Sequence, residues 1–238
     1  MSFAFVFPGQ GSQSVGMLAA LASAEPLVQE TFAEASSVLG YDLWQLCQQG
    51  PEEQLGATER TQPAMLTAAV ATWRVWRKHG GPLPSAMAGH SLGEYSALVC
   101  AGVLQFSSAV DLVRQRGEFM QSAVPVGVGG MAAVIGLDDA AIIRACSEAS
   151  DAEVVAAVNF NSPGQVVISG HSGAVARAGE LCKSAGAKRV LPLSVSAPFH
   201  SPLMKPAAEH FAETLAKVAL APPVIPVLQN YGLAVSDD

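Results

Sequence analysis

A serine between two glycines is the first candidate for chemistry in this sequence. The stretch from Gly89 to Gly93 reads Gly-His-Ser-Leu-Gly and fits the Gly-x-Ser-x-Gly pattern, with a short strand predicted at 86–88 and a helix running on to about Cys100. A sharp strand-to-helix turn strains the central serine, Ser91, and projects its hydroxyl, while small flanking residues relieve crowding. The first amides of the helix point where an oxyanion would develop. The pattern indicates a nucleophilic serine, although a glycine-rich turn with an exposed serine would read the same.

A nucleophilic serine needs a base, and histidine is the usual one. The chain has five histidines: His79, His90, His171, His200 and His210. His200 lies in a loop stiffened by Pro198 and Pro202, which is where a positioned base is expected. The others fall at a helix end, on the serine turn with the ring directed away, at a helix start and on a surface helix. No aspartate or glutamate stands out as the third member of a triad.

The elements around the serine alternate between strands and helices. A continuous apolar strand is predicted at 3–7, buried on both faces, and a glycine-rich loop follows at 8–13. Helical patterns cover 26–39 and 63–79, the second with a proline near its start. This alternation, which leads into the strand before the serine, predicts an α/β core with parallel strands.

The order of elements changes after Pro125. The predicted elements are a strand at 131–136, a helix at 139–149, strands at 154–160 and 166–169, a helix at 172–185 and a strand at 189–195. This β-α-β-β-α-β order predicts a ferredoxin-like subdomain at 126–196, inserted in a core made of 1–125 and 197–238. The chain returns to the core with a helix near 207–219 and a strand near 224–228.

Composition narrows the class of protein. The 238 residues are 50% hydrophobic and 14% charged, which fits a folded globular chain. Mean hydropathy is +0.32, but polar residues, glycine or proline interrupt every apolar run well before the ~20 residues that span a bilayer. The four cysteines are scattered, so neither a zinc site nor a disulfide framework is expected. The start of the chain has no signal-peptide pattern, and scattered cysteines are typical of reduced thiols, so a cytoplasmic protein is expected. A net charge of −7 argues against nucleic-acid binding, and we expect a monomer.

One arginine lies where a helix should be buried. In a helix over 107–122, the apolar stripe consists of Ala109, Val110, Val113, Gly117 and Met120. Arg116 falls on the edge of this stripe, whereas Arg114 points away from it. A guanidinium on a burying face needs an anionic partner, either a ligand or a structural carboxylate of the protein.

Together these features resemble the malonyl-CoA:acyl-carrier-protein transacylase family in its stand-alone bacterial form. The matching segments lie in family order along nearly the whole sequence: 5–13, 89–97, Arg116-Gly117-x-x-Met120, 159–165 and Phe199-His200. The resemblance implies an α/β-hydrolase-like core with a ferredoxin-like insertion, in agreement with the pattern of elements. In the family a further stretch carries Asn-Pro-Val-x-Trp and Val-Gly-Pro-Gly, so a C-terminal part of the core is expected to be missing.

The resemblance also implies a mechanism. Ser91 would take the malonyl group from malonyl-CoA with His200 as base, and then pass it to the phosphopantetheine thiol of acyl carrier protein for fatty-acid synthesis. The backbone N–H groups of Gln10 and Leu92 would form the oxyanion hole, and Arg116 would bind the malonyl carboxylate. The coenzyme A thioester is a substrate, and no cofactor or metal is implied.

Further substrate contacts follow from the resemblance. Phe199 would narrow the pocket over the acyl α-carbon and favour malonyl over methylmalonyl units, and Asn161 would also contact the substrate. The loop at Gln10 could otherwise be an ordinary turn; a phosphate loop is excluded, because Gly-Lys-Ser/Thr is absent.

A local basic cluster is needed for an acidic carrier protein, because this chain is itself acidic. Lys183, Lys188 and Arg189 form such a cluster, which could equally be a solvated helix end. Two other functions remain open: a serine hydrolase of patatin-like type, and a partner-binding remnant without activity.

Overall fold

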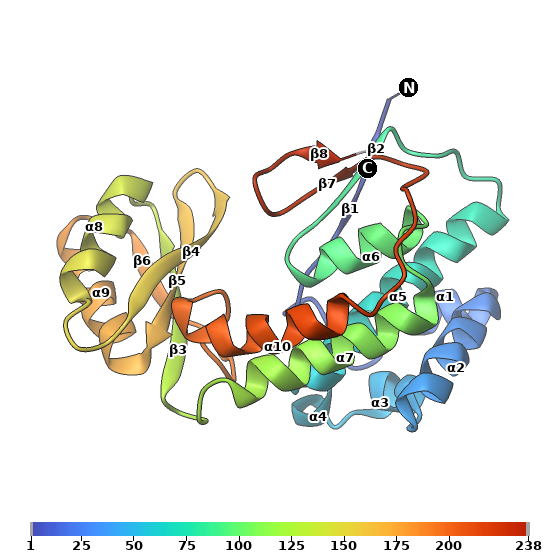
Figure 1. The fold of residues 1–238 in the computed structure, drawn as a ribbon, viewed down its shortest axis with the longest axis horizontal. Helices are drawn as coiled ribbons and strands as arrows, with labels where there is room; N and C mark the ends of the chain where they lie inside the picture. Colours follow the sequence, from blue (N-terminus) through green and yellow to red (C-terminus); the bar gives the residue numbers. More distant parts are fainter. Residues whose placement is uncertain (1, 237–238) are drawn as a thin grey trace. The chain divides into compact units, whose positions relative to one another are not determined.

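A computed structural model describes residues 2–236 of the chain (Figure 1). It divides into two compact units. The first comprises residues 1–117 together with 214–238, and the second comprises residues 118–213. The first unit therefore combines the two ends of the sequence, with the second unit inserted between them.

Each boundary between the units falls inside a helix. The helices are α7 (Phe106–Ser122) and α10 (Lys205–Leu215). The sequence instead places the limits of the inserted subdomain at 126–196. The difference arises because the end of α7 and the start of α10 contribute Met120 and Ala207 to a buried apolar cluster of the second unit.

The sheet of the first unit carries the predicted parallel strands. They are β1 (Ala4–Phe7), β2 (Ala86–Gly89) and β7 (Val227–Leu228), and β8 (Val235–Ser236) pairs antiparallel to β7, in the order β1-β2-β7-β8. Phe7 pairs with Gly89, and these are the last residues of β1 and β2. The segments that follow the two strands therefore both leave the sheet at the carboxyl ends of its parallel strands. Ligand-binding sites of parallel sheets usually lie at the carboxyl ends of the strands.

A group of helices makes up most of the rest of the first unit, and within it the last of them before α7 packs against β1 and β2. These helices are α1 (Ala19–Ala24), α2 (Leu27–Leu39), α3 (Leu43–Gln49), α4 (Glu52–Gly56), α5 (Thr58–Lys78) and α6 (Leu92–Cys100). The sequence predicts α5 only from Pro63 onward, which is wrong, because the helix begins at Thr58 and contains the proline. Proline there removes only one N–H bond near the helix start, and the earlier turn is retained.

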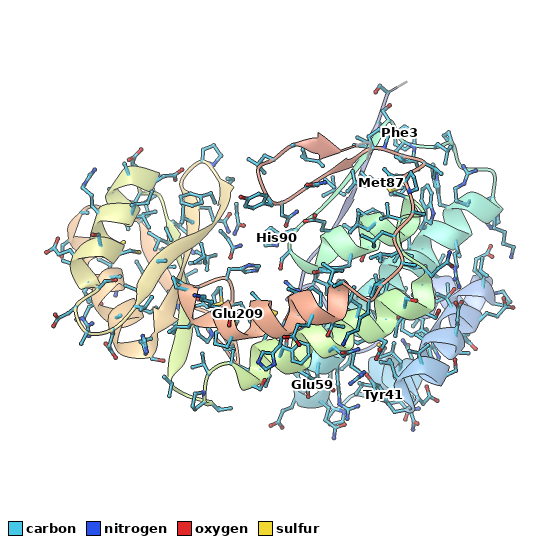
Figure 2. The ribbon with its side chains drawn as sticks, viewed as in Figure 1. Phe3, Tyr41, Glu59, Met87, His90 and Glu209 are labelled. Carbon is cyan, nitrogen blue, oxygen red and sulfur yellow. The ribbon has the colours of Figure 1, made fainter. Side chains whose placement is uncertain are left out.

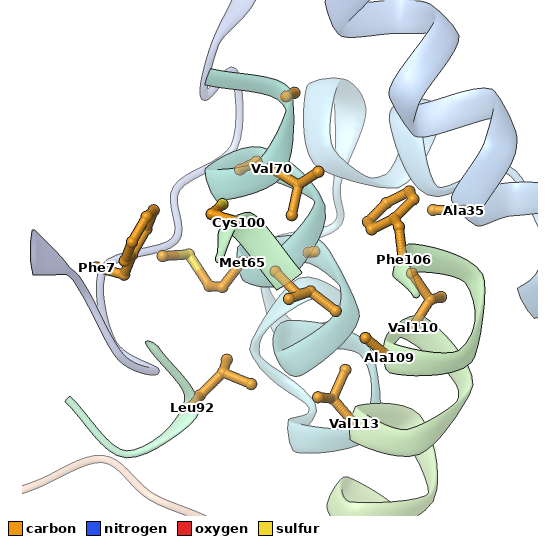
Figure 3. Packing of buried hydrophobic residues seen from close by; sticks show 14 of the residues in the cluster. Phe7, Ala35, Met65, Val70, Leu92, Cys100, Phe106, Ala109, Val110 and Val113 are labelled. Atoms are coloured by element: carbon orange, nitrogen blue, oxygen red, sulfur yellow. The ribbon is translucent and has the colours of Figure 1, made fainter. Parts of the chain in front are cut away.

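The core of the first unit joins β1, α5, α6 and α7. Figure 3 shows its packing, with Phe7, Met65, Leu92, Ala109 and Val113 among the buried side chains. Burial of a side chain such as that of Leu92, which is 1% exposed, stabilises the fold by about 1.5–3 kcal/mol. Because the buried side chain of Leu92 packs in this core, the first residue of α6 is held in place.

Strand β1 departs from the expected burial. The sequence predicts a strand buried on both faces, whereas the side chain of Val6 is 72% exposed. Phe5, on the other face, packs against Trp73 and Trp76 of α5 with ring centroids 5.4 and 5.6 Å apart. The strand lies at the edge of its sheet and is covered on one face, so only alternate residues are buried.

The second unit has the predicted ferredoxin-like order. Its elements are β3 (Gly129–Ile135), α8 (Asp139–Ala149), β4 (Val155–Ser162), β5 (Gln165–His171), α9 (Ser172–Ser184) and β6 (Arg189–Pro192). The strands form an antiparallel sheet in the order β4-β5-β3-β6, with α8 and α9 packed side by side on it (Figure 1). Val134, Ile142, Ile168 and Ala178 close the core between these layers. Within residues 2–236, no helix has the length and apolar character that crossing a bilayer requires.

Candidate active site

The candidate nucleophile lies in a strained turn between β2 and α6. Ser91 has φ 52° and ψ −106°, a conformation that costs a residue other than glycine about 1–3 kcal/mol. Backbone bonds fix its neighbours: the His90 N–H donates to Phe7 O over 3.1 Å, and the Glu94 N–H donates to Ser91 O over 3.1 Å. Met87 on β2 and His90 at the turn are labelled in Figure 2. The turn therefore has the geometry that the Gly-x-Ser-x-Gly pattern predicts.

The glycines of this turn are required by space. A Cβ atom on Gly89 would lie 1.9 Å from the carbonyl carbon of Gly93, and one on Gly93 would lie 2.2 Å from Phe7 O. Gly9, in the loop after β1, is crowded as well, since its Cβ would lie 2.7 Å from the His90 carbonyl oxygen. The loop after β1 therefore packs directly against the turn that holds the serine.

Arg116 reaches the serine from α7. Its Nη2 donates to Ser91 Oγ over 3.3 Å, and its Nη1 donates to Gln62 Oε1 over 2.7 Å. The next residue, Gly117, permits this approach, because a Cβ there would lie 2.6 Å from the Cα of Glu59. Arg114 instead forms an ion pair with Asp111 at 2.7 Å on its own helix.

A buried chain of hydrogen bonds continues from Arg116 to the loop after β1. Gln62 Nε2 donates to Thr58 Oγ1 over 3.2 Å, and the Thr58 hydroxyl donates to Gln10 Oε1 over 2.8 Å. Both Gln62 and Thr58 are completely buried. Buried polar groups normally have partners, and here the bonds link the guanidinium to the loop that carries Gln10. Sequence reasoning missed both residues, because it began α5 after them.

The guanidinium of Arg116 is partly buried. Desolvation holds the pKa of Arg116 below its usual value, and Tyr95 and Glu94 oppose that shift. The guanidinium carbon lies 5.5 Å from the centre of the Tyr95 ring. Burial also raises the pKa of the Glu94 carboxyl, against the opposing effects of the Asn230 N–H and of Arg116. A cation held away from water favours an anionic ligand beside it.

Asn230 contacts both sides of the serine turn. Its Oδ1 accepts from the Ser91 N–H at 2.7 Å, and its Nδ2 donates to Gly89 O over 2.6 Å. Its own N–H donates to Glu94 Oε2 over 3.0 Å. No sequence pattern indicates a role for this residue, because an asparagine followed by Tyr-Gly after a short strand is typical of any turn.

The remaining candidate residues for substrate and catalysis lie in the second unit. His200 has φ 63° in a tight loop where the Ser201 hydroxyl donates to Pro198 O over 2.7 Å. Phe199 is 7% exposed and packs in an apolar cluster, whereas Asn161 is exposed on β4. The structure thus brings Ser91, Arg116 and Gln10 together within the first unit, and holds the other three candidates in the second.

The basic residues considered for docking are also in the second unit. Lys183 pairs with Glu180 at 2.8 Å near the end of α9. Lys188 and Arg189 are exposed at the start of β6, and the aliphatic part of Lys188 lies over Gly136. The cluster is accessible, and its net positive charge is reduced by the glutamate beside Lys183.

Other titratable groups have structural roles or remain buried. His171 Nδ1 accepts from the Val154 N–H at 2.9 Å, and His79 pairs with Glu25. Burial raises the pKa of the Cys47 and Cys100 thiols to about 12, so these thiols are poor nucleophiles. Among residues 2–236, no group of three or more His, Cys, Asp or Glu side chains could hold a metal ion.

An α/β fold that presents a strained serine at a strand-to-helix turn, with an arginine in contact with it, fits a serine-dependent acyltransferase. Comparison with protein families agrees, since the acyl transferase domain matches residues 4–233.

Comparison with individual proteins places the chain in a narrower group of acyltransferases. The malonyl CoA-acyl carrier protein transacylase of Salmonella typhimurium is 64% identical over 99% of this chain and 76% of its own length. An acyl carrier protein S-malonyltransferase structure from Vibrio cholerae has a TM-score of 0.97 at 60% identity, covering 100% of this chain and 78% of that one. A malonyl-transacylase solved with a type II PKS acyl-carrier protein has a TM-score of 0.99 at 59% identity, covering 100% and 77%. The chain therefore belongs to the acyl transferase domain family, among its stand-alone malonyl-CoA:acyl-carrier-protein transacylases.

Proposed function

We propose that Ser91 is the nucleophile and that Arg116 binds the carboxylate of the acyl group it accepts. The observation that carries this proposal is the 3.3 Å contact between Arg116 Nη2 and Ser91 Oγ in the strained turn. A guanidinium placed there can hold an anionic group one or two bonds away from the carbon that the serine attacks. Malonyl has a free carboxylate at that distance, whereas acetyl has none.

The reaction is the transfer of malonyl from malonyl-CoA to the phosphopantetheine thiol of acyl carrier protein, and it supplies fatty-acid synthesis. In the first half, Ser91 Oγ attacks the thioester carbonyl, its proton passes to a base, and the C–S bond breaks. The coenzyme A thiolate takes up the proton and leaves a malonyl ester on the serine. In the second half, the carrier thiol loses its proton, attacks this ester, and the serine recovers its hydroxyl.

His200 is the proposed base in both halves. His200 itself has a left-handed backbone conformation with φ 63°, and the prolines at 198 and 202 restrict the backbone of its loop. The oxyanion would be bound by the backbone N–H groups of Gln10 and Leu92. Crowding between Gly9 and the serine turn supports this assignment, because it keeps the Gln10 loop next to the N-terminus of α6.

Selectivity for malonyl would rest on Arg116, and Phe199 and Asn161 are the further substrate contacts that we propose. The planar guanidinium forms two charge-assisted hydrogen bonds with a carboxylate. Phe199 is bulky and firmly packed, which suits a wall that excludes a methyl branch on the α-carbon.

The proposed partners are malonyl-CoA and an acidic acyl carrier protein, with docking at Lys183, Lys188 and Arg189. The enzyme would act as a cytoplasmic monomer, without nucleic acid or membrane, and would need no cofactor beyond the coenzyme A thioester itself. The exposure of Lys188 and Arg189 supports the docking assignment.

The test is the intact mass of the protein after brief incubation with malonyl-CoA. A malonyl adduct that is absent from Ser91→Ala and disappears when carrier protein is added is the expected result. Release of free malonate without carrier protein would indicate a serine hydrolase instead. No adduct on a folded chain would indicate a protein that binds partners without catalysis.

A further inference from the structure

The turn that contains the strained residue Ser91 is held partly by backbone hydrogen bonds and partly by a side chain. The bonds around the turn use the His90 N–H, the Gly93 N–H and the carbonyl of Ser91 itself. The Ser91 N–H is bound by a side chain instead, Asn230 Oδ1, at 2.7 Å. The backbone group that sets the φ of the nucleophile is thus held by a residue 139 positions further along the chain.

The same amide group also holds the strand side of the turn. Asn230 Nδ2 donates to Gly89 O over 2.6 Å, while Oδ1 accepts from Ser91. One planar amide therefore bridges the last residue of β2 and the nucleophile, and a rotation of the turn in either direction would break one of the two bonds. This is the geometry of a clamp across a strained residue.

Asn230 is itself held in place. It lies shortly after β7, which pairs with β2 through Met87–Val227 and Ala88–Leu228. Because β2 and β7 are parallel, Asn230 and the serine turn both follow the carboxyl ends of their strands. Its N–H donates to Glu94 Oε2 over 3.0 Å, and the Gln229 N–H next to it donates to Ala234 O over 2.9 Å. The sheet pairing and the α6 carboxylate fix the backbone from which the amide projects.

We infer that Asn230 is a positioning residue that holds Ser91 in its reactive conformation by clamping Gly89 and the Ser91 N–H. The inference rests on the proposed role of Ser91 as the nucleophile. Asn230 acts through the backbone of the turn, so its loss alters the rate of acylation and leaves the affinity for malonyl-CoA close to that of the wild type.

The test compares Asn230→Ala and Asn230→Asp with the wild type and with Gln229→Ala. Rapid mixing with malonyl-CoA and intact-mass detection give the rate of adduct formation and its dependence on malonyl-CoA concentration. Asn230→Ala should lower the maximal acylation rate about tenfold to a hundredfold, with half-saturation changed by less than about threefold. Asn230→Asp retains the acceptor for the Ser91 N–H and loses the donor to Gly89, so its rate should fall between the two. Gln229→Ala should acylate at the wild-type rate.

Thermal unfolding of each variant separates positioning from folding. If Asn230→Ala melts as the wild type does and acylates at the wild-type rate, the inference is wrong while the proposed function stands. If Asn230→Asp is no faster than Asn230→Ala, or if half-saturation changes as much as the rate, the clamp is not the cause. Wild-type protein that forms no adduct on Ser91 would instead overturn the proposed function.

Discussion

The guanidinium of Arg116 lies between Ser91 Oγ, 3.3 Å from Nη2, and Gln62 Oε1, 2.7 Å from Nη1. One side chain thus contacts the candidate nucleophile and the start of a buried polar chain that ends at Gln10. The position of the charge is set by three elements, α5, α6 and α7, rather than by a flexible side chain alone. A carboxylate beside Ser91 would meet a cation that is already oriented.

Replacement of Arg116 should separate malonyl from acetyl transfer. Removing one member of a buried charge pair costs ~3–5 kcal/mol, so Arg116→Ala should lower kcat/KM for malonyl-CoA by roughly two to three and a half decades. Acetyl transfer, which has no carboxylate to bind, should hold steady or rise. Arg116→Lys should recover only part of the activity, and Arg114→Ala, whose parent pairs with Asp111, should change little. Equal losses with both acyl groups would make Arg116 a structural residue.

Replacement of the proposed nucleophile, Ser91, and of the proposed base, His200, should have distinct effects. Ser91→Ala should abolish the acyl-enzyme and leave the melting temperature near that of the wild type, because the side chain removed is small. His200→Ala should still form the adduct, at a rate lower by about 10²–10⁴. Intact mass spectrometry over time measures both. An adduct that persists in Ser91→Ala would rule out the serine as nucleophile.

Replacement of Gln62 should lower both stability and malonyl transfer, because its side chain forms hydrogen bonds with Arg116 and Thr58. Gln62→Leu leaves Arg116 Nη1 and the Thr58 hydroxyl without this partner in a buried place, at a cost of about 1–3 kcal/mol in the free energy of unfolding. Malonyl transfer should fall more than acetyl transfer, because the guanidinium is no longer oriented. Urea unfolding and kcat/KM for the two substrates measure these effects. Thr72→Val, on the same helix and remote from Arg116, serves as the control.

Charge reversal at the second unit should affect only the second half-reaction. Lys188→Glu with Arg189→Glu should raise KM for the carrier protein and weaken its dependence on salt, because an attractive surface is lost. Acylation by malonyl-CoA should stay close to wild type. Both half-reactions can be followed separately by mass. Equal damage to both would indicate a folding defect.

Glu94 should make stability depend on pH. Burial raises the pKa of its carboxyl in the folded state above the usual 4.5, so the proton is bound more tightly folded than unfolded. This contribution of Glu94 to the free energy of unfolding is fully present below pH 4.5, and it is lost as the pH rises through the pKa of the folded state. Glu94→Gln, which cannot ionise, should therefore gain stability relative to the wild type between acid and neutral pH. Chemical unfolding at a series of pH values would show this, and parallel curves would contradict it.

The sequence predicts the features that depend on local pattern. The serine turn, the ferredoxin-like order and the phase of α7 follow from glycine spacing and hydrophobic periodicity, and the structure has each of them. The exposed face of β1 does not follow, because a run of apolar residues looks the same in an edge strand and in a central one.

The site is less predictable than the fold, for a physical reason. Thr58 and Gln62 are polar residues on a buried helix face, which a pattern search excludes unless their partners are known. Asn230 acts through contacts with segments far away in the sequence, and only the pairing of β7 with β2 brings it to Ser91. Local patterns therefore locate the proposed nucleophile but not the residues that hold it.

The long separation between Ser91 and Asn230 has a consequence for biosynthesis. On a ribosome that adds about 5–20 residues per second, Asn230 is made roughly 7 to 28 seconds after Ser91, because 139 positions separate them. The second unit, residues 118–213, is synthesised in that interval. The nascent chain thus has a serine whose turn lacks its final hydrogen bonds until β7 pairs with β2, a contact of high sequence separation that forms late. Reactivity at Ser91 should accordingly appear only after Asn230 has been synthesised and β7 has paired with β2.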